Sequence, residues 1–497
     1  MKLAGYAKII DQYKLAVIPN WHESVISSGG LASRAQTPEG HVRESFPAAY
    51  EPADNLGAQL EFALKYDGVN LLILSQLFAA ANREDITSYI QSRPTGKYTR
   101  RIWYLYEALT DAQLPIDDLA QGNYVELLDS KDYYTTPGKP SARHRVRDNL
   151  LGDMRFCPTI RRSAKLAAFE ASDLGKKCRA IMEAYPLELL QRALSYLYTK
   201  ESKSSFEIEH IKPTAARTQR FVALLQTAEK DDFFQKMSLI ALQNSIVDER
   251  FRDHDYRATQ NYVGESVAPQ AERVHYVSPR PADLPAMMEG MFSAHGRMSV
   301  DTIHPAVHAA AIAYGFVFMH PFEDGNGRIH RFLIHNILAR RGFTPPGIMF
   351  PVSAAMLKNI AAYDASLEAF SRPLLPFIDY ALDDQGRMTV HNDTGNFYRY
   401  LDFTAQAEAL FQFIQETIEV ELVEELGFLA SHGKTKRAIR EIVDMPDRLV
   451  DLFIRCCLQN QGNLSAGKRG QFFSMLTDQE IVSMEAAVRQ GYGSEAN

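Results

Sequence analysis

Cysteine is scarce in this sequence, and the few cysteines show no spacing typical of a metal site. The chain of 497 residues has four of them, Cys157, Cys178 and the adjacent pair Cys456 and Cys457. Adjacent cysteines seldom bond to each other, and zinc sites need cysteines or histidines at short, regular spacings. The sequence therefore excludes a disulfide-rich secreted scaffold, and we expect a reduced, cytoplasmic protein.

Long apolar runs and an excess of positive charge are also missing. No apolar run approaches the roughly 18 residues that a membrane-spanning helix needs. The first residues carry Lys2, Lys8, Asp11 and Lys14 among their apolar positions, so a secretory signal is not expected. The net charge is −7, whereas nucleic-acid-binding surfaces are usually basic. We therefore expect neither a membrane nor a nucleic acid among the partners.

The chemistry of the chain is concentrated in the stretch from His320 to Arg331, HPFEDGNGRIHR. An apolar run, 306–319, precedes it, and apolar residues at helical spacing follow it, so the pattern predicts a helix, a polar loop with glycines and a second helix. Glycines let backbone N–H groups converge, and the N-terminus of a helix attracts anions. Together these features predict a site for phosphate groups.

Four side chains in this stretch have suitable chemistry for phosphoryl or nucleotidyl transfer. Arg328 and Arg331 are three residues apart on the second helix, so both could bind one anion. His320 is placed to act as a base, and Asp324 offers a hard oxygen ligand for magnesium.

The same stretch resembles the Fic family motif H-x-F-x-[D/E]-G-N-G-R-x-x-R at every specified position. The matching residues are His320, Phe322, Asp324, Gly325, Asn326, Gly327, Arg328 and Arg331. Members of this family typically transfer the AMP part of ATP to a hydroxyl of a protein. The resemblance implies a mainly α fold, with a Fic-type helical core, a β-hairpin flap, and additional mostly helical domains on both sides.

The resemblance also implies a role for each residue of the motif. Asp324 would hold Mg²⁺, and the backbone of residues 325–327, with the Asn326 side chain, would cradle the phosphates of ATP. Arg328 and Arg331 would neutralise the β- and γ-phosphates, and His320 would take the proton of the target's Tyr, Ser or Thr hydroxyl. Tyr363 would approach the base of the nucleotide, although a core aromatic residue is an equal interpretation of it.

A second pattern lies upstream of the motif, near residues 203–211. Many Fic proteins carry an inhibitory helix with the pattern [S/T]-x-x-x-E-[G/N], and Ser205 and Glu209 fit it, whereas His210 replaces the Gly or Asn. The resemblance implies that Glu209 pairs with Arg331 and obstructs productive binding of ATP. Sequence physics alone favours an ordinary amphipathic turn with surface carboxylates.

Around these motifs we divide the chain into three regions. Residues 1–155 form an N-terminal domain without an assigned role, in which 27–48 is a loop or linker. The Fic core spans 156–382, with the flap at 256–277, and 383–497 form a C-terminal helical domain. The flap prediction rests on β-branched and aromatic residues around a polar turn.

Three other functions remain open: removal of AMP from a modified protein, a different nucleotide donor, and a DNA-binding regulator with a largely silent Fic core. The last would use outer helical regions such as the basic and aromatic segment 97–109, although such a segment more often packs its aromatics into a core. The expected partners are ATP and a protein with an available hydroxyl; self-modification and a homodimer are further options.

Overall fold

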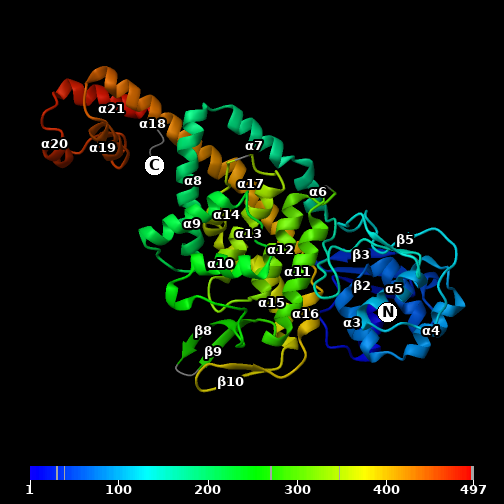
Figure 1. Ribbon diagram of the computed structural model, residues 1–497. Helices are drawn as coiled ribbons and strands as arrows, with labels where there is room; N and C mark the ends of the chain where they lie inside the picture. The colour runs from blue at the N-terminus through cyan, green and yellow to red at the C-terminus, as the bar shows by residue number, and fades with distance from the viewer. Residues whose placement is uncertain (30–31, 38–39, 269–270, 301, 346, 494–497) are drawn as a thin grey trace.

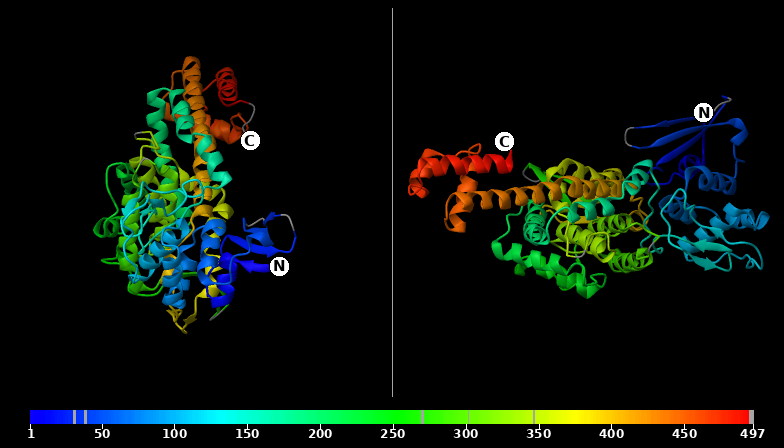
Figure 2. Two further views of the ribbon diagram at one scale, coloured as in Figure 1. Left: turned by 90° about the vertical axis from the view of Figure 1, so that its right-hand side faces the viewer. Right: turned by 90° about the horizontal axis from the view of Figure 1, so that it is seen from above.

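The computed structural model describes residues 1–29, 32–37, 40–268, 271–300, 302–345 and 347–493. The molecule is elongated, with an N-terminal unit at one end, a large helical body in the middle and a small helical module at the other end (Figure 1). Seen from above, the helix α18 runs out of the body to this module (Figure 2). In the described part of the chain, no helix has the length and apolar content needed to span a bilayer.

The N-terminal unit combines the predicted helices with two small sheets, which the sequence did not predict. Its four-stranded sheet has the order β1-β2-β4-β3, and a three-stranded sheet has the order β5-β7-β6. Its elements are β1 (Lys2–Ala4), α1 (Gly5–Tyr13), β2 (His22–Ser27), β3 (Ser33–Gln36), β4 (Val42–Pro47), α2 (Leu56–Phe62), α3 (Leu71–Ala80), α4 (Arg83–Ser92), α5 (Lys97–Thr110), β5 (Val125–Glu126), β6 (Lys139–Ser141) and β7 (Val146–Asp148).

The segment 27–48 contains two of these strands, where the sequence predicted a loop or linker. Strand β4 pairs in parallel with β2 and antiparallel with β3. Every residue of β3 is exposed, so this edge strand lacks the alternation of apolar and polar residues that reveals a strand in a sequence. Residues 30–31 and 38–39 of the segment lie outside the described residues.

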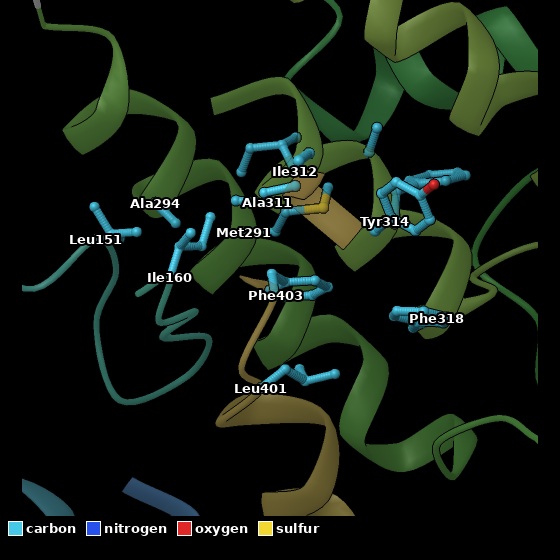
Figure 3. Packing of buried hydrophobic residues seen from close by; sticks show 14 of the residues in the cluster. Leu151, Ile160, Met291, Ala294, Ala311, Ile312, Tyr314, Phe318, Leu401 and Phe403 are labelled. Carbon is cyan, nitrogen blue, oxygen red and sulfur yellow. The ribbon is translucent and has the colours of Figure 1, made fainter. Parts of the chain in front are cut away.

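The body is built around α12, which is apolar on all sides and buried along its whole length except at its first residue. Helices α11, α13 and α17 pack against it, and Figure 3 shows Met291 of α11, Phe403 before α17 and α12 residues such as Tyr314 and Phe318 in this packing. The helices are α6 (Ala164–Ala171), α7 (Leu174–Glu183), α8 (Leu187–Glu207), α9 (Ala215–Thr227), α10 (Lys236–Ile246), α11 (Leu284–Met298), α12 (Pro305–Met319), α13 (Asn326–Arg340), α14 (Val352–Lys358), α15 (Ile360–Leu374), α16 (Gly395–Arg399) and α17 (Thr404–Glu416).

Two antiparallel hairpins complete the body. The first, β8 (Tyr262–Ala268) and β9 (Ala271–Val277), is the hairpin predicted at 256–277, and it begins later because residues before Tyr262 are irregular. Residues 269 and 270 at its tip lie outside the described residues. The second hairpin is β10 (Tyr380–Leu382) and β11 (Met388–Val390).

The predicted domain boundary at 382/383 is not a boundary in the structure. It falls in the turn of the second hairpin, and the following helix α17 buries Leu410, Phe411 and Ile414 in the central core. An amphipathic helix of this kind needs an apolar partner, and α12 supplies it. A separate core begins only near Ile439, in the module formed by the end of α18 (Leu422–Ile442), α19 (Asp447–Leu458), α20 (Ala466–Phe472) and α21 (Asp478–Tyr492).

Candidate active site

His320 stands at the point where the buried helix α12 ends. Its backbone is left-handed, with a φ of 48°, and Pro321 follows it, so the helix stops here and the chain turns into the motif loop. The Nδ1 atom donates to the carbonyl of Val317 at 3.1 Å. That bond leaves Nε2 as the unprotonated ring nitrogen. Burial lowers the pKa of His320 to about 4, so the ring is neutral at physiological pH.

Two residues, Phe322 and Asn326, hold the motif loop together. Phe322 is fully buried and packs near Phe316, as expected for an apolar anchor. Asn326 accepts from the Phe322 N–H through Oδ1 at 3.1 Å and donates to the Phe322 carbonyl through Nδ2 at 2.7 Å. The Asn326 amide thus closes the loop, and its contact with a phosphate stays a prediction.

Gly325 precedes α13 with a φ of 91°, a conformation that favours glycine, and a Cβ there would lie 2.9 Å from Val247. Its N–H donates to Asp324 at 2.6 Å. The first bond within the helix runs from Ile329 back to the Gly325 carbonyl, so the N–H groups of residues 326–328 have no partner inside the helix. The backbone N–H groups of residues 326–328 therefore lie at the N-terminus of α13, the Gly325 N–H is engaged by Asp324, and the binding of a phosphate here stays a prediction.

Arg328 is the third residue of α13 and is fully buried. Its Nη2 bonds Asp324 at 2.7 Å and its Nε lies 2.7 Å from Oε2 of Glu209. The guanidinium also lies over the ring of Phe206. A buried arginine is stable only with such compensating partners, and both of its carboxylates come from predicted site residues.

Arg331 lies one turn further along and is also buried. Its Nε donates to the Ser205 hydroxyl at 2.9 Å and its Nη2 donates to the Ser205 carbonyl at 2.5 Å. Nη2 also binds Oε1 of Glu209 at 2.8 Å. Burial disfavours the charge of Arg331, but Glu209 outweighs this effect and raises the pKa of Arg331 above its ordinary value.

Glu209 therefore bridges the two arginines, one with each carboxylate oxygen. The sequence pattern predicted its contact with Arg331 but not the second contact, with Arg328. The predicted helix near 203–211 is the end of the longer helix α8, which ends at Glu207, so Glu209 lies in the turn that follows. His210 ends the helix because its φ is 56°, a left-handed conformation that Gly and Asn adopt more easily.

Tyr363 lies in the interior, where 3% of it is exposed. Its hydroxyl lies 3.5 Å from Nη1 of Arg331. This position favours the interpretation as a core aromatic residue that lines the Arg331 pocket, and a contact with a nucleotide base stays a prediction.

Asp324 reaches solvent, with 41% of its side chain exposed. Nη2 of Arg328 and the N–H of Gly325 both donate to Oδ1 of Asp324. The described residues contain no group of three ligand side chains that could hold a metal without help. Magnesium commonly uses one or two carboxylates together with phosphate oxygens and water, so the chemistry of Asp324 fits Mg²⁺ only when a nucleotide is present.

Gln243, which the sequence did not single out, supports the motif loop from the neighbouring helix α10. Gln243 of α10 is fully buried and its Nε2 donates to Asp253 at 3.1 Å and to the Asp324 carbonyl at 3.3 Å. In the sequence, Gln243 occupies a position of α10 that would otherwise be apolar. A polar side chain at a buried position needs hydrogen-bond partners, and this is the signal that could have pointed to Gln243.

The basic and aromatic segment 97–109 forms α5, far from the motif loop in Figure 1. Trp103 is buried, as the structural interpretation predicted, but Arg100 and Arg101 are buried as well. They donate to backbone carbonyls of Asn123 and Glu126, at 2.7 and 2.8 Å. Both guanidinium groups thus stabilise their own unit and are not presented to a nucleic acid.

Comparison with known proteins agrees with the motif. Residues 233–338 match the model of the Fic/DOC family. A protein of Culex quinquefasciatus named "Protein adenylyltransferase Fic" is 29% identical over 215 residues, which are 39% of this chain and 40% of that protein. A protein of the same name from Nematostella vectensis is 37% identical over 95 residues, 19% of this chain and 20% of that protein. The chain thus spans less than half of the length of these relatives.

Among solved structures, a Fic family protein from Desulfovibrio desulfuricans G20 shares 17% identity, with a TM-score of 0.37 over 63% of this chain and 85% of that chain. A likeness at this TM-score supports no conclusion about the function. The complete motif and the family match identify the chain as a Fic-domain protein, whose Fic/DOC domain covers residues 233–338.

Proposed function

We propose that this protein transfers AMP from ATP to a hydroxyl of a target protein, and that Glu209 restrains the reaction. The observation that carries the proposal is the bridge from Glu209 to Arg328 and Arg331 at the N-terminus of α13. A carboxylate occupies the place where two arginines and free N–H groups could bind a phosphate. The relatives named as protein adenylyltransferases support the direction of the chemistry.

In the proposed reaction the triphosphate lies along the N-terminus of α13. Arg328 and Arg331 bind its β- and γ-phosphates, and Nε2 of His320 takes the proton from the target hydroxyl. The hydroxyl oxygen attacks the α-phosphorus, forms the new P–O bond and expels pyrophosphate. A magnesium ion held by Asp324 and phosphate oxygens would neutralise charge on the phosphates during this transfer.

The restraint follows from competition for the arginines. While Glu209 binds Arg331, the guanidinium is not available to the γ-phosphate, and the carboxylate repels the incoming negative charge. ATP bound without Arg331 would lie in a pose unsuited to in-line attack. Ser205 supports the restraint because its hydroxyl and carbonyl hold Arg331 in the orientation that meets Glu209.

The test is transfer of label from α-labelled ATP by four forms of the protein: wild type, Glu209→Gly, Glu207→Gly, and Glu209→Gly with His320→Ala. Glu207 is an exposed neighbour at the end of α8, so its replacement loosens the same helix end without touching the arginines. We expect weak labelling by the wild type and by Glu207→Gly, strong self-labelling by Glu209→Gly, and none once His320 is also replaced.

Two outcomes would contradict the proposal. Equal labelling by Glu209→Gly and the wild type removes Glu209 as the restraint, and labelling that survives the loss of His320 removes the assigned base. Release of AMP from a previously labelled protein by the wild type, without net transfer, would instead favour the reverse reaction. A preference for another nucleotide is detected by repeating the assay with labelled CTP, GTP and UTP.

A further inference from the structure

Arg257 is a buried cation beside the motif loop, and nothing above gives it a role. It lies in the irregular segment before β8, and 4% of it is exposed. Within the described residues it takes part in no ion pair, and burial lowers its pKa to about 10. Burying an arginine without a carboxylate is costly, so the contacts that hold it here need a physical explanation.

The guanidinium of Arg257 donates to three backbone carbonyls. Nε binds the carbonyl of His320 at 2.8 Å, Nη1 binds that of Thr259 at 2.7 Å, and Nη2 binds that of Pro279 at 2.5 Å. The backbone N–H of Arg257 donates to the carbonyl of Pro321 at 2.8 Å. One residue therefore binds two successive carbonyls of the motif loop through its side chain and its main chain.

The other two acceptors belong to the stem of the hairpin. Thr259 precedes β8 and Pro279 follows β9, so the planar guanidinium joins both ends of the hairpin to the carbonyl of His320. The hairpin is tied to the core by neutral contacts too. Tyr276 donates to the Phe318 carbonyl, and Asn261 donates to that of Phe322 at 3.3 Å. Arg257 adds the contact to His320 itself.

The position of His320 explains why such a donor is needed. His320 is a non-glycine residue in a left-handed conformation at the end of α12, which strains the backbone unless the surroundings hold it. The carbonyls at the end of a helix have no partner within that helix. Three N–H groups in a rigid plane can bind this carbonyl and the two stem carbonyls together, which a lysine cannot do.

We propose that Arg257 is a positioning residue that fixes the base His320 relative to the hairpin on which a target segment would align. The proposal rests on the AMP transfer proposed above. Arg328 and Arg331 bind Glu209, Ser205 and Asp324 from α13, whereas Arg257 binds the loop from the side of the hairpin. Loss of Arg257 should therefore slow the transfer and leave the affinity for the nucleotide unchanged.

The experiment uses the full chain in the Glu209→Gly background, with Arg257→Met, Arg257→Lys and the matched control Arg280→Met. Arg280 lies at the other end of the hairpin, after β9, and pairs with Asp283 and Asp393. Three quantities are measured: the single-turnover rate of self-labelling from α-labelled ATP, the Kd of Mg²⁺ with α,β-methylene-ATP by calorimetry, and the pKa of the His320 ring by NMR. The charged groups that act on the ring are Arg257 and Asp324, with opposite effects on its pKa.

A displacement of the base by about 1 Å costs roughly 100-fold in rate, so we expect Arg257→Met to lose about that factor. Arg257→Lys keeps the charge but not the three bonds, so its rate should fall to an intermediate value. The pKa of His320 should rise in Arg257→Met, because a nearby cation that disfavours the imidazolium is gone, and stay low in Arg257→Lys. The Kd should remain within about threefold of the parent in all variants.

An unchanged labelling rate in Arg257→Met, or a loss equal to that of Arg280→Met, would overturn the proposal. If Arg257→Met does not fold, the lysine variant decides, because an unchanged rate there excludes the positioning role. If the Glu209→Gly parent does not label at all, the proposed function fails, and Arg257 is judged by structure alone. Faster amide exchange in residues 259–268 and 271–279 with a raised pKa of His320 then supports it, and unchanged exchange and pKa refute it.

Discussion

Glu201 on α8 accepts a hydrogen bond from Nε2 of His335 on α13 at 2.7 Å, and both residues are buried. The N–H and the hydroxyl of Ser353, at the start of α14, donate to the same carboxylate. Glu201 lies about two turns before Glu209, so this contact fixes the helix that leads to Glu209 against the helix that carries Arg328 and Arg331.

Replacement of Glu201 by Gln should loosen this junction. The amide keeps the volume but loses the charge that His335 and Ser353 bind, and breaking a buried pair costs on the order of 3 kcal/mol. We expect a lower midpoint of thermal unfolding and more self-labelling than in the wild type. Glu207→Gln, on the exposed side of α8, is the control that should change neither. If Glu201→Gln lowers the unfolding midpoint but leaves the labelling unchanged, the prediction fails, because the packing of α8 then does not control the restraint.

Replacement of His210 by Gly should strengthen the restraint. His210 has a φ of 56°, where a residue with a Cβ is strained by about 1 kcal/mol and glycine is not. We expect a slightly higher unfolding midpoint and weaker residual labelling by the otherwise wild-type protein. Asn should have a smaller effect in the same direction, and Ala none. Labelling that increases in the Gly variant would show that flexibility of the turn matters more than its conformation.

The pH dependence of the released Glu209→Gly variant should follow His320. The pKa of His320 is lowered to about 4, so the base is neutral and active above that value and is lost by protonation as the pH falls through it. We expect no decline in labelling between about pH 8 and pH 6, where an ordinary histidine near 6.5 would already titrate. The measurement is the initial labelling rate against pH, with circular dichroism at each point as the control for folding. A midpoint near 6.5 would contradict the assigned environment.

Stability, in contrast, should decrease in mild acid. Burial lowers the pKa of His330 to about 3 and that of His308 well below its ordinary value, and neither ring reaches solvent. The unfolded chain binds these protons from about pH 6.5 downward and the folded chain does not, so stability is full above that pH and falls below it. Each fully buried histidine contributes a slope of up to about 1.4 kcal/mol per pH unit.

Urea unfolding at pH 7 and pH 5.5 checks this expectation, and His330→Phe serves as the comparison. The phenyl ring fills the space against Tyr314 without a group to protonate, so the loss between the two pH values should be smaller in the variant. An equal loss would place the acid sensitivity in other groups.

The sequence predicted those parts of the site that are contiguous or that repeat a short pattern. His320, Asp324 and the arginines lie within twelve residues, and Ser205 and Glu209 are four apart, so their relation survives without knowledge of the fold. The second contact of Glu209, with Arg328, depends on the path of the turn after α8 and on which face α13 turns toward that turn. It could not follow from spacing alone.

Other features depended on contacts between distant segments. Arg257 meets His320 across 63 positions, and a lone arginine in a polar segment carries no signal of that contact. Strand β3 has no alternating pattern because both of its faces are exposed. The helix α17 packs on α12, although the sequence placed it in a separate domain. An apolar stripe shows that a helix face is covered but not which surface covers it.

Gly327 lies where Glu209 and Arg331 meet the motif loop. A Cβ at this position would lie 2.5 Å from Oε1 of Glu209 and 3.3 Å from Nη1 of Arg331. The missing side chain thus admits the carboxylate into the same space that the proposed function assigns to a phosphate. Under the proposed function, a side chain at 327 that excluded Glu209 would exclude the nucleotide as well, so the restraint could be tuned by substitutions in α8 and its turn but not at this position.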